Sequence, residues 1–135
     1  MKIKNLKGRK QITAAFRRGK HFASGPLLVH VRGIDQQSLP DAPSGAGLSI
    51  FMICAVRKKQ VPLAVTRNRI KRIIRECVRV FVKIHPSIPI MTLAFVWQKP
   101  MQHHSEAKTQ DIQPIVHDVL HQAMQYFSAK QGSET

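Results

Sequence analysis

The fold of this chain is decided by the stretch RNRIKRIIRECVRVFVKI, residues 67–84, because it has the pattern of one amphipathic helix. At 3.6 residues per turn, its apolar residues fall within an arc of roughly 120°, which is typical of a helix lying on a core. They are Ile70, Ile73, Ile74, Cys77, Val80, Phe81 and Ile84. We therefore expect a long helix over 67–84 that packs through this arc.

The opposite side of the same helix is strongly basic. It carries Arg67, Asn68, Lys71, Arg72, Arg75, Arg79 and Lys83, with Arg69 at its edge. Like charges one turn apart repel one another, and within this stretch only Glu76 relieves the repulsion. The pattern indicates a surface that binds an anionic partner.

The whole chain has the size and charge of one basic domain. Its 135 residues are 43% hydrophobic, which suits a single compact core, and its formal net charge is +15. Of 22 Lys and Arg residues, eight lie in 1–20 and ten in 57–83. A merely solvated surface mixes the two signs, so this concentration favours a binding surface for a polyanion: RNA, DNA or an acidic membrane.

Apolar patterns predict the elements around the central helix. A short helix is expected at 11–18, ended by Gly19 in the left-handed conformation, and a last helix is expected from Asp111, with Pro114 in its first turn. Strands are expected at 27–31, 48–56 and 90–97. The two strands flanking the central helix should be parallel. Residues 1–127 then form one domain with a flexible loop at 33–47, and 128–135 form a disordered tail.

No group of side chains suggests catalysis or a metal site. The acids are Asp35, Asp41, Glu76, Glu106, Asp111, Asp118 and Glu134, too scattered to predict a carboxylate cluster. The pairs His117/His121 and His103/His104 lack further ligands nearby, so solvated histidines are favoured over zinc.

The cysteines and the hydropathy pattern indicate a cytoplasmic protein. Cys54 and Cys77 lack metal spacing and lie in apolar patterns, as buried reduced thiols do. The chain has neither a secretion signal at 1–8 nor the roughly 18 consecutive apolar residues of a membrane span.

One segment of the sequence resembles the signature of the bacterial ribonuclease P protein subunit. In that family a Lys-Lys pair ends a strand, and a short loop leads into an Arg-Asn-Arg-x-Lys-Arg-x-x-Arg-Glu helix. The matching residues here are Arg57-Lys58-Lys59 and the run AVTRNRIKRIIRE, residues 64–76. Similarity continues through Leu6, Phe16 and Gly19, the strand near 91–96 and the last helix. Ile12 and Thr92 depart from the pattern, standing where the family usually has an aromatic residue and an Asp.

The resemblance implies an α+β fold. The family folds as a single-domain two-layer α/β sandwich, with a mixed sheet and a left-handed β-α-β crossover, the ribosomal protein S5 domain 2-like fold. Chain physics alone predicts the opposite hand, because such crossovers are right-handed in about 98% of cases.

The resemblance also implies a function. The chain would be the protein subunit of an endonuclease that removes the 5′ leader of precursor tRNA, inactive without an RNA subunit that holds the catalytic Mg²⁺. Catalytic-RNA contacts would come from Arg67, Asn68, Arg69, Lys71, Arg72 and Arg75. Leader contacts would come from Phe16, Arg17, Lys20, Lys58 and Lys59. Neither a membrane nor DNA is expected as a partner.

Three alternatives stay open at this point. Phe16 has helical spacing from Ile12 and therefore suits core packing as well as base stacking. A structural RNA-binding protein of the ribosome or another ribonucleoprotein explains the charge equally well, although it does not explain the ordered motif. A protein-only nuclease is disfavoured by the scattered carboxylates.

Overall fold

The chain folds around one five-stranded mixed sheet. A computed structural model describes residues 2–45 and 49–133, with side chains described up to residue 129. The strand order is β1-β4-β5-β3-β2, with β1, β4 and β5 parallel to one another and β3 antiparallel to both β5 and β2. The strands are β1 Lys2–Asn5, β2 Lys20–Ser24, β3 Leu27–Gly33, β4 Ser49–Val56 and β5 Ile90–Trp97.

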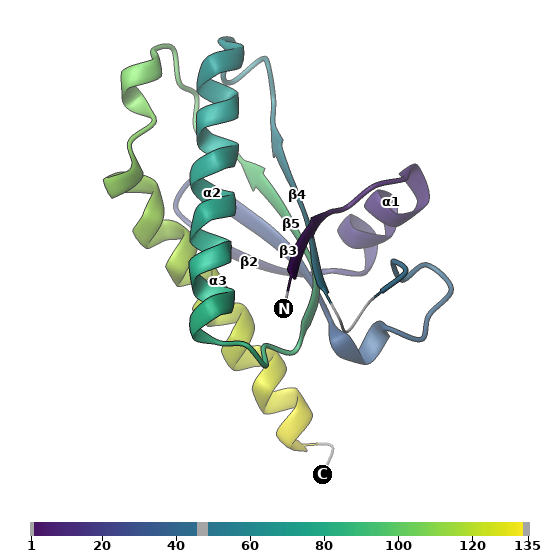
Figure 1. The fold of residues 1–135 in the computed structure, drawn as a ribbon. Coiled ribbons are helices and arrows are strands. Elements are labelled where there is room, and N and C mark those ends of the chain that lie inside the picture. The colour runs from purple at the N-terminus through teal and green to yellow at the C-terminus, as the bar shows by residue number, and fades with distance from the viewer. Residues whose placement is uncertain (1, 46–48, 134–135) are drawn as a thin grey trace.

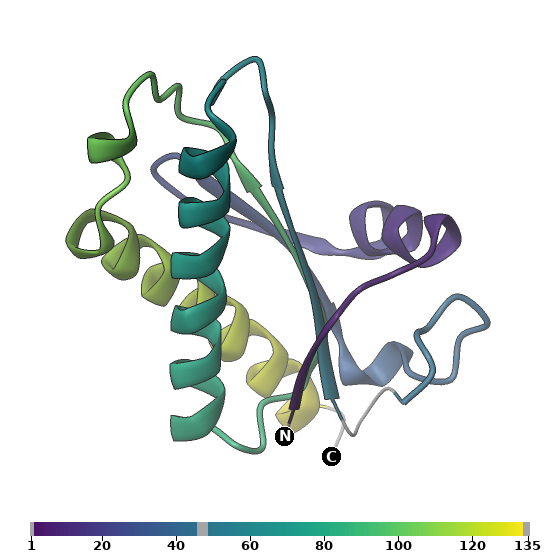
Figure 2. The same ribbon diagram turned by 45° about the horizontal axis from the view of Figure 1, so that its top comes forward.

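Three helices cover the two faces of this sheet. α2 and α3 lie together on one face, and the shorter α1 lies on the other (Figures 1 and 2). The helices are α1 Arg9–Arg18, α2 Ala64–Ile84 and α3 Thr109–Ser133, and the 3₁₀ turns are η1 Ile34–Gln36 and η2 His104–Glu106. Among the described residues, no helix is long and apolar enough to cross a membrane.

The unit β4-α2-β5 has the expected parallel strands and the unusual hand. β4 and β5 pair in parallel from Phe51↔Thr92 to Val56↔Trp97. With α2 toward the viewer and β4 running upward, β5 lies to the left of β4 (Figure 1), which makes the crossover left-handed. The α+β fold class implied by the resemblance is therefore confirmed.

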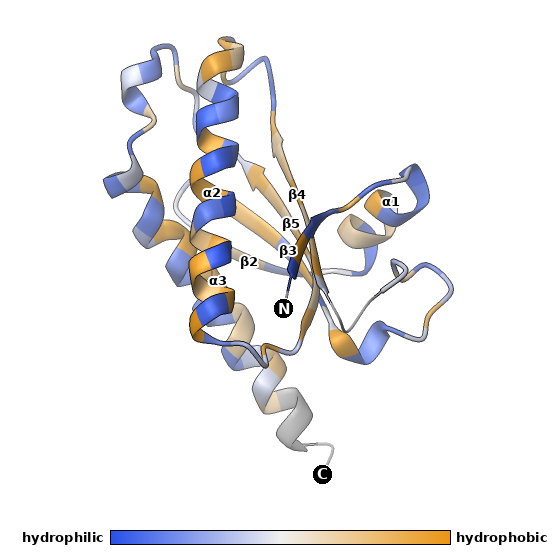
Figure 3. Cartoon of the chain, in the orientation of Figure 1, coloured by the Kyte–Doolittle hydropathy of each residue, from blue (hydrophilic) through white to orange (hydrophobic). Residues whose placement is uncertain are grey.

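The main core lies between the sheet and the pair α2 and α3. Helix α2 alternates polar and apolar bands along its length, as the sequence pattern predicts (Figure 3). Its buried stripe is rotated from the predicted arc, because Val78 and Val82 are buried, whereas Val80 and Ile84 are 40% and 64% exposed. Ile84 is exposed at the last position of the helix, and Val80 faces a groove between α2 and α3. The predicted burial of these two residues is wrong.

Several predicted boundaries also differ from the structure. α1 begins at Arg9, α2 at Ala64 and α3 at Thr109, each two or three residues before the predicted start. Six of the eight residues expected in a disordered tail are helical, because neither Gly nor Pro occurs in 128–131; residues 134–135 lie outside the described chain. Leu48, the predicted first residue of β4, also lies outside the described residues.

Gly19 ends α1 for a different reason from the one predicted. Its φ of −75° and ψ of 141° are extended, not left-handed. A Cβ at this position would lie 2.5 Å from the carbonyl oxygen of Ala15 and 2.8 Å from Cβ of His30. Glycine is therefore needed because α1 and β3 approach each other closely here.

Candidate nucleic-acid interface

The exposed side of α2 presents cations without protein partners. Asn68, Lys71 and Arg72 are exposed, and within the described residues none of their side chains forms a hydrogen bond to a protein group. The amphipathic pattern explains this, because the opposite side of the same turns carries buried Ile70, Ile73 and Ile74. These polar side chains are free to contact a polyanion.

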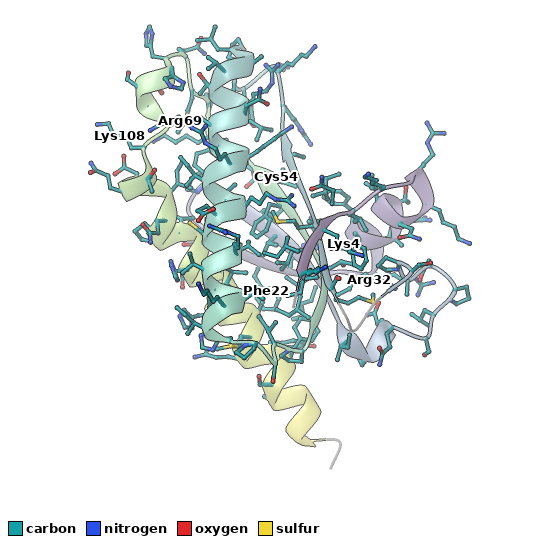
Figure 4. All side chains as sticks on the ribbon, in the orientation of Figure 1. Lys4, Phe22, Arg32, Cys54, Arg69 and Lys108 are labelled. Carbon is teal, nitrogen blue, oxygen red and sulfur yellow. The ribbon has the colours of Figure 1, made fainter. Side chains whose placement is uncertain are left out.

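Arg67 and Arg69 occupy the same turns but bind backbone carbonyls. Nη1 of Arg67 donates to the carbonyl oxygens of Val61 and Pro62 at 2.9 and 2.8 Å. Nε of Arg69 donates to the carbonyl oxygen of Ala107 at 2.5 Å, and its side chain bridges α2 and the segment before α3 (Figure 4). Both side chains are half-buried, so they hold the loops that flank the basic face as well as adding charge to it.

Asn68 does not cap the helix. α2 begins at Ala64 after Leu63, and no side chain caps its first turn. Asn68 therefore lies inside the helix, on its exposed side, where its side chain is available for an RNA contact.

The two basic blocks of the sequence meet at the edge of the sheet. Arg75 of α2 donates a hydrogen bond to the side-chain oxygen of Asn5 in β1. Beside this contact lies a cavity of about 550 Å³ with Lys2, Arg79 and Lys83 on its walls. Strand β1 therefore adds Lys2 to the charge of α2.

Phe16 lies in a row of three rings on the α1 side of the sheet. Its ring centroid is 5.0 Å from that of His30 in β3, and the His30 centroid is 4.2 Å from that of His21 in β2, both in edge-to-face geometry. Phe16 is half-buried and packs with Ile12 and Ile53 on a small second core of Leu6, Ala15, Phe51 and Ala94. It is thus both a packing residue and a partly open aromatic surface.

The two histidines of this row were not predicted from the sequence. His21 and His30 are directly opposite in the β2–β3 register, on the face away from Val29 and Val31. For His30 the sequence contained a signal, because apolar and polar residues alternate along β3 and put His30 on the face opposite Val29 and Val31. Burial and, to a smaller extent, the neighbouring His21 lower the pKa of His30, so its ring is uncharged at neutral pH.

The basic residues proposed to contact the leader do not all reach Phe16. Lys58 and Lys59 are exposed in the turn after β4, closed by the hydrogen bond from Val61 N to Arg57 O at 2.9 Å. Arg17 is exposed on α1 and borders a pocket beside Asp41. Lys20 points to the other face of the sheet, where its Nζ lies 4.8 Å from the Tyr126 ring centroid of α3. The structure separates Lys20 from the rings.

Several acidic and thiol groups in the described part of the chain are paired or buried. No group of three or more His, Cys, Asp or Glu there is arranged to hold a metal ion. Glu76 accepts hydrogen bonds from Arg79 at 2.5 and 3.2 Å. Burial raises the pKa of Cys54 to about 12 and also raises that of Cys77, so both thiols are protonated.

Comparison with known proteins defines the class to which this basic α+β domain belongs. The family model for Ribonuclease P matches residues 1–123. Similar proteins include the ribonuclease P protein components of Rippkaea orientalis, 33% identical over 81 residues, and of a Psychrobacter species, 39% identical over 67 residues. These matches cover 60% and 49% of this chain, and 59% and 49% of the relatives' lengths. The chain belongs to the ribonuclease P protein family.

Solved structures show the same fold at lower identity. A Staphylococcus aureus RNase P protein structure at 2.0 Å superposes with a TM-score of 0.60 and 22% identity, covering 88% of this chain and 94% of that one. A second S. aureus structure gives a TM-score of 0.58 and 21% identity, covering 89% and 88%.

Proposed function

We propose that this chain is the protein subunit of ribonuclease P in the cytoplasm. It binds the catalytic RNA and the 5′ leader of precursor tRNA, and it assists the endonucleolytic cut that gives mature tRNA 5′ ends. The observation that carries the proposal is the exposed basic side of α2, with the free cations Lys71 and Arg72, in a chain of this family. Positive charge on one face of a domain is the electrostatic footprint of nucleic-acid binding.

The catalytic RNA is assigned to α2 and β1. Lys71, Arg72 and Arg75 contact phosphates, and Asn68 adds a hydrogen bond from the same side. A guanidinium has five N–H donors, so Arg67 and Arg69 retain donors for phosphate after binding their carbonyls.

The leader is assigned to the opposite face of the sheet. Phe16 and the exposed ring of His21, with buried His30 between them, offer a stacking surface for a single strand, which suits binding with little sequence preference. Arg17 is exposed on α1 next to Phe16 in sequence, and Lys58 and Lys59 add exposed positive charge in the turn after β4. We assign no leader contact to Lys20, because its side chain lies across the sheet from Phe16.

Catalysis is assigned to the RNA, which would hold the Mg²⁺ ions, as the resemblance implies. Two carboxylates of this chain, Asp41 and Glu76, are engaged by arginines. The protein then contributes positioning and electrostatic stabilisation of the two RNAs.

The test is a cleavage assay with three mixtures at low salt and Mg²⁺: protein alone, cognate ribonuclease P RNA alone, and both. We expect the protein alone to cut nothing, and its addition to the RNA to increase removal of the leader. Cleavage at the mature 5′ end by RNA-free protein would overturn the assignment of catalysis to RNA. Binding without any increase in cleavage would favour a structural RNA-binding protein.

Substitutions on α2 should separate RNA contact from structural support. Lys71→Ala and Arg72→Ala should each weaken RNA binding, and each should reduce the slope of log affinity against log salt by about 0.9 per lost phosphate contact. Neither should lower thermal stability, because both side chains are exposed. An affinity unchanged across several salt concentrations would reject their role.

Arg67→Ala is the comparison variant on the same face. It removes two charge-assisted hydrogen bonds to carbonyl oxygens. We expect it to lower the free energy of unfolding by about 1 to 3 kcal/mol, measured by urea denaturation without RNA. A stability equal to that of the parent would show that these hydrogen bonds are not required.

A further inference from the structure

A pocket of about 360 Å³ lies between α2 and α3, on the side of α2 that continues the basic face. Its floor is apolar, formed by buried Ile73 and Cys77 and by Val80, which is 40% exposed. A contiguous apolar floor that is open in a groove between two helices is available to contact a ligand. The size is near the lower end of small-molecule sites, roughly 300–1,000 Å³, and suits one nucleotide but excludes a duplex.

The rim of this pocket is polar and mainly positive. Arg69 and Arg72 stand at the end nearest the start of α2, and Thr109 and Gln113 of α3 line the opposite wall. Arg72 is exposed and unpaired within the described residues, and Arg69 uses Nε for Ala107. The one carboxylate of the rim, Glu76, is paired with Arg79.

We propose that this pocket binds one unstacked nucleobase of the RNA that docks on α2, an inference that rests on the proposed function. The base lies on the apolar floor at Val80, and its phosphate lies on the guanidinium of Arg72. These residues are eight positions apart, roughly 12 Å along a helix, and the long side chain of Arg72 lines the same pocket, which shortens the distance that one nucleotide has to span. Sequence-specific RNA recognition uses splayed bases held by stacking and by hydrogen bonds at their edges. The Gln113 amide and the Thr109 hydroxyl offer those hydrogen bonds.

Charge complementarity favours RNA over a peptide side chain as the occupant. An apolar peptide residue would satisfy Val80 but would leave Arg72 without an anion, in a pocket that adjoins the cations Lys71 and Arg75. A nucleotide provides a base for the apolar floor at Val80 and a phosphate for Arg72. The pocket therefore adds base contact to a surface that otherwise binds phosphates.

The test fills the pocket without removing charge. Val80→Phe places a ring over the floor, and Ile84→Phe is the matched control, one turn further along α2 at a residue 64% exposed and outside the pocket. We expect Val80→Phe to weaken binding of the cognate ribonuclease P RNA about tenfold, because the larger side chain fills the volume that the base would occupy. The salt slope should stay unchanged, because no phosphate contact is lost. Ile84→Phe should bind like the parent.

Footprinting with dimethyl sulfate and a carbodiimide then locates the base. A single nucleotide should be protected in complexes with the parent and with Ile84→Phe, and reactive in the complex with Val80→Phe. Equal affinities and identical footprints for the three proteins would overturn the proposal. A parent that does not bind the RNA at all would instead refute the proposed function, so the two failures are distinguishable. If Val80→Phe fails to fold by circular dichroism, Gln113→Leu is the second variant, and the same nucleotide should become reactive.

Discussion

Replacing Arg32 with alanine is expected to lower the free energy of unfolding by about 3 to 5 kcal/mol, because a buried side chain and its three hydrogen bonds are lost. Arg32 is fully buried on the α1 side of β3. Its Nε donates to Gln36 Oε1 at 2.8 Å, and its two Nη atoms donate to the carbonyl and carboxylate oxygens of Asp41 at 3.1 and 2.9 Å. Alanine removes these hydrogen bonds and leaves a cavity. Urea denaturation of the free protein measures the effect.

Arg32→Met is the matched control, because methionine fills most of the space without a charge. After either change Asp41 retains its ion pair with Arg18 of α1, but methionine leaves a smaller cavity than alanine, so we expect a smaller loss for Arg32→Met. If both variants lose the same free energy of unfolding, the loss comes from the missing hydrogen bonds and not from the cavity. A loss under about 1 kcal/mol for Arg32→Ala would mean that the buried network does not stabilise the fold.

The ion pairs of Asp41 with Arg18 and Arg32 should make the stability of the fold depend on pH. Burial opposes ionisation of Asp41, but hydrogen bonds and charge from Arg18 and Arg32 outweigh it and lower the pKa of its carboxyl. Its contribution to stability is therefore present above the ordinary Asp pKa of about 3.9, and is lost as the pH falls through the lowered value. Asp41 connects α1, β3 and the loop after η1, which links this network to the position of Phe16.

The centre of the fold was predictable because its signals are local. The period of 3.6 in 67–84 specifies α2, and the continuous apolar runs ending at Val56 and Trp97 specify two strands buried on both faces. The edge strands β1 and β2 were missed because Lys2, Lys4 and Lys20 interrupt any apolar pattern, as charges on edge strands often do. The hand of the crossover came from the family resemblance.

For the candidate site, the sequence predicted only which residues lie on the exposed face of a helix. Periodicity placed Lys71 and Arg72 on the exposed side of α2, but could not show that Arg69 reaches Ala107, which is 38 residues away. The ring row needed the register of β2 against β3, which pairs His21 with His30 and turns Lys20 to the other face. Contacts between elements distant in sequence are set by the tertiary fold, and spacing along the chain does not contain them.

Phe16→Leu is expected to weaken binding of precursor tRNA by the holoenzyme by about 1 to 3 kcal/mol, or about 5- to 150-fold, the cost of one lost stacking surface. Affinity for mature tRNA, which has no leader, should stay unchanged. Leucine keeps most of the packing of Phe16 against Ile12 and Ile53 but has no ring to stack on a base or to meet His30. The measurement is the ratio of the two dissociation constants, with thermal unfolding of the free protein as the check on folding.

Phe16→Ala distinguishes the two roles of this residue. Because Phe16 is half-buried, truncation removes packing as well as the ring. If packing alone matters, alanine destabilises the free protein by up to about 3 to 5 kcal/mol and weakens both tRNAs together, while leucine behaves like the parent. If stacking matters, leucine and alanine lose the preference for precursor tRNA to the same extent, whatever their stabilities. A leucine variant that keeps the full preference would therefore reject Phe16 as the stacking surface and leave His21, the exposed ring of the row, as the remaining aromatic candidate.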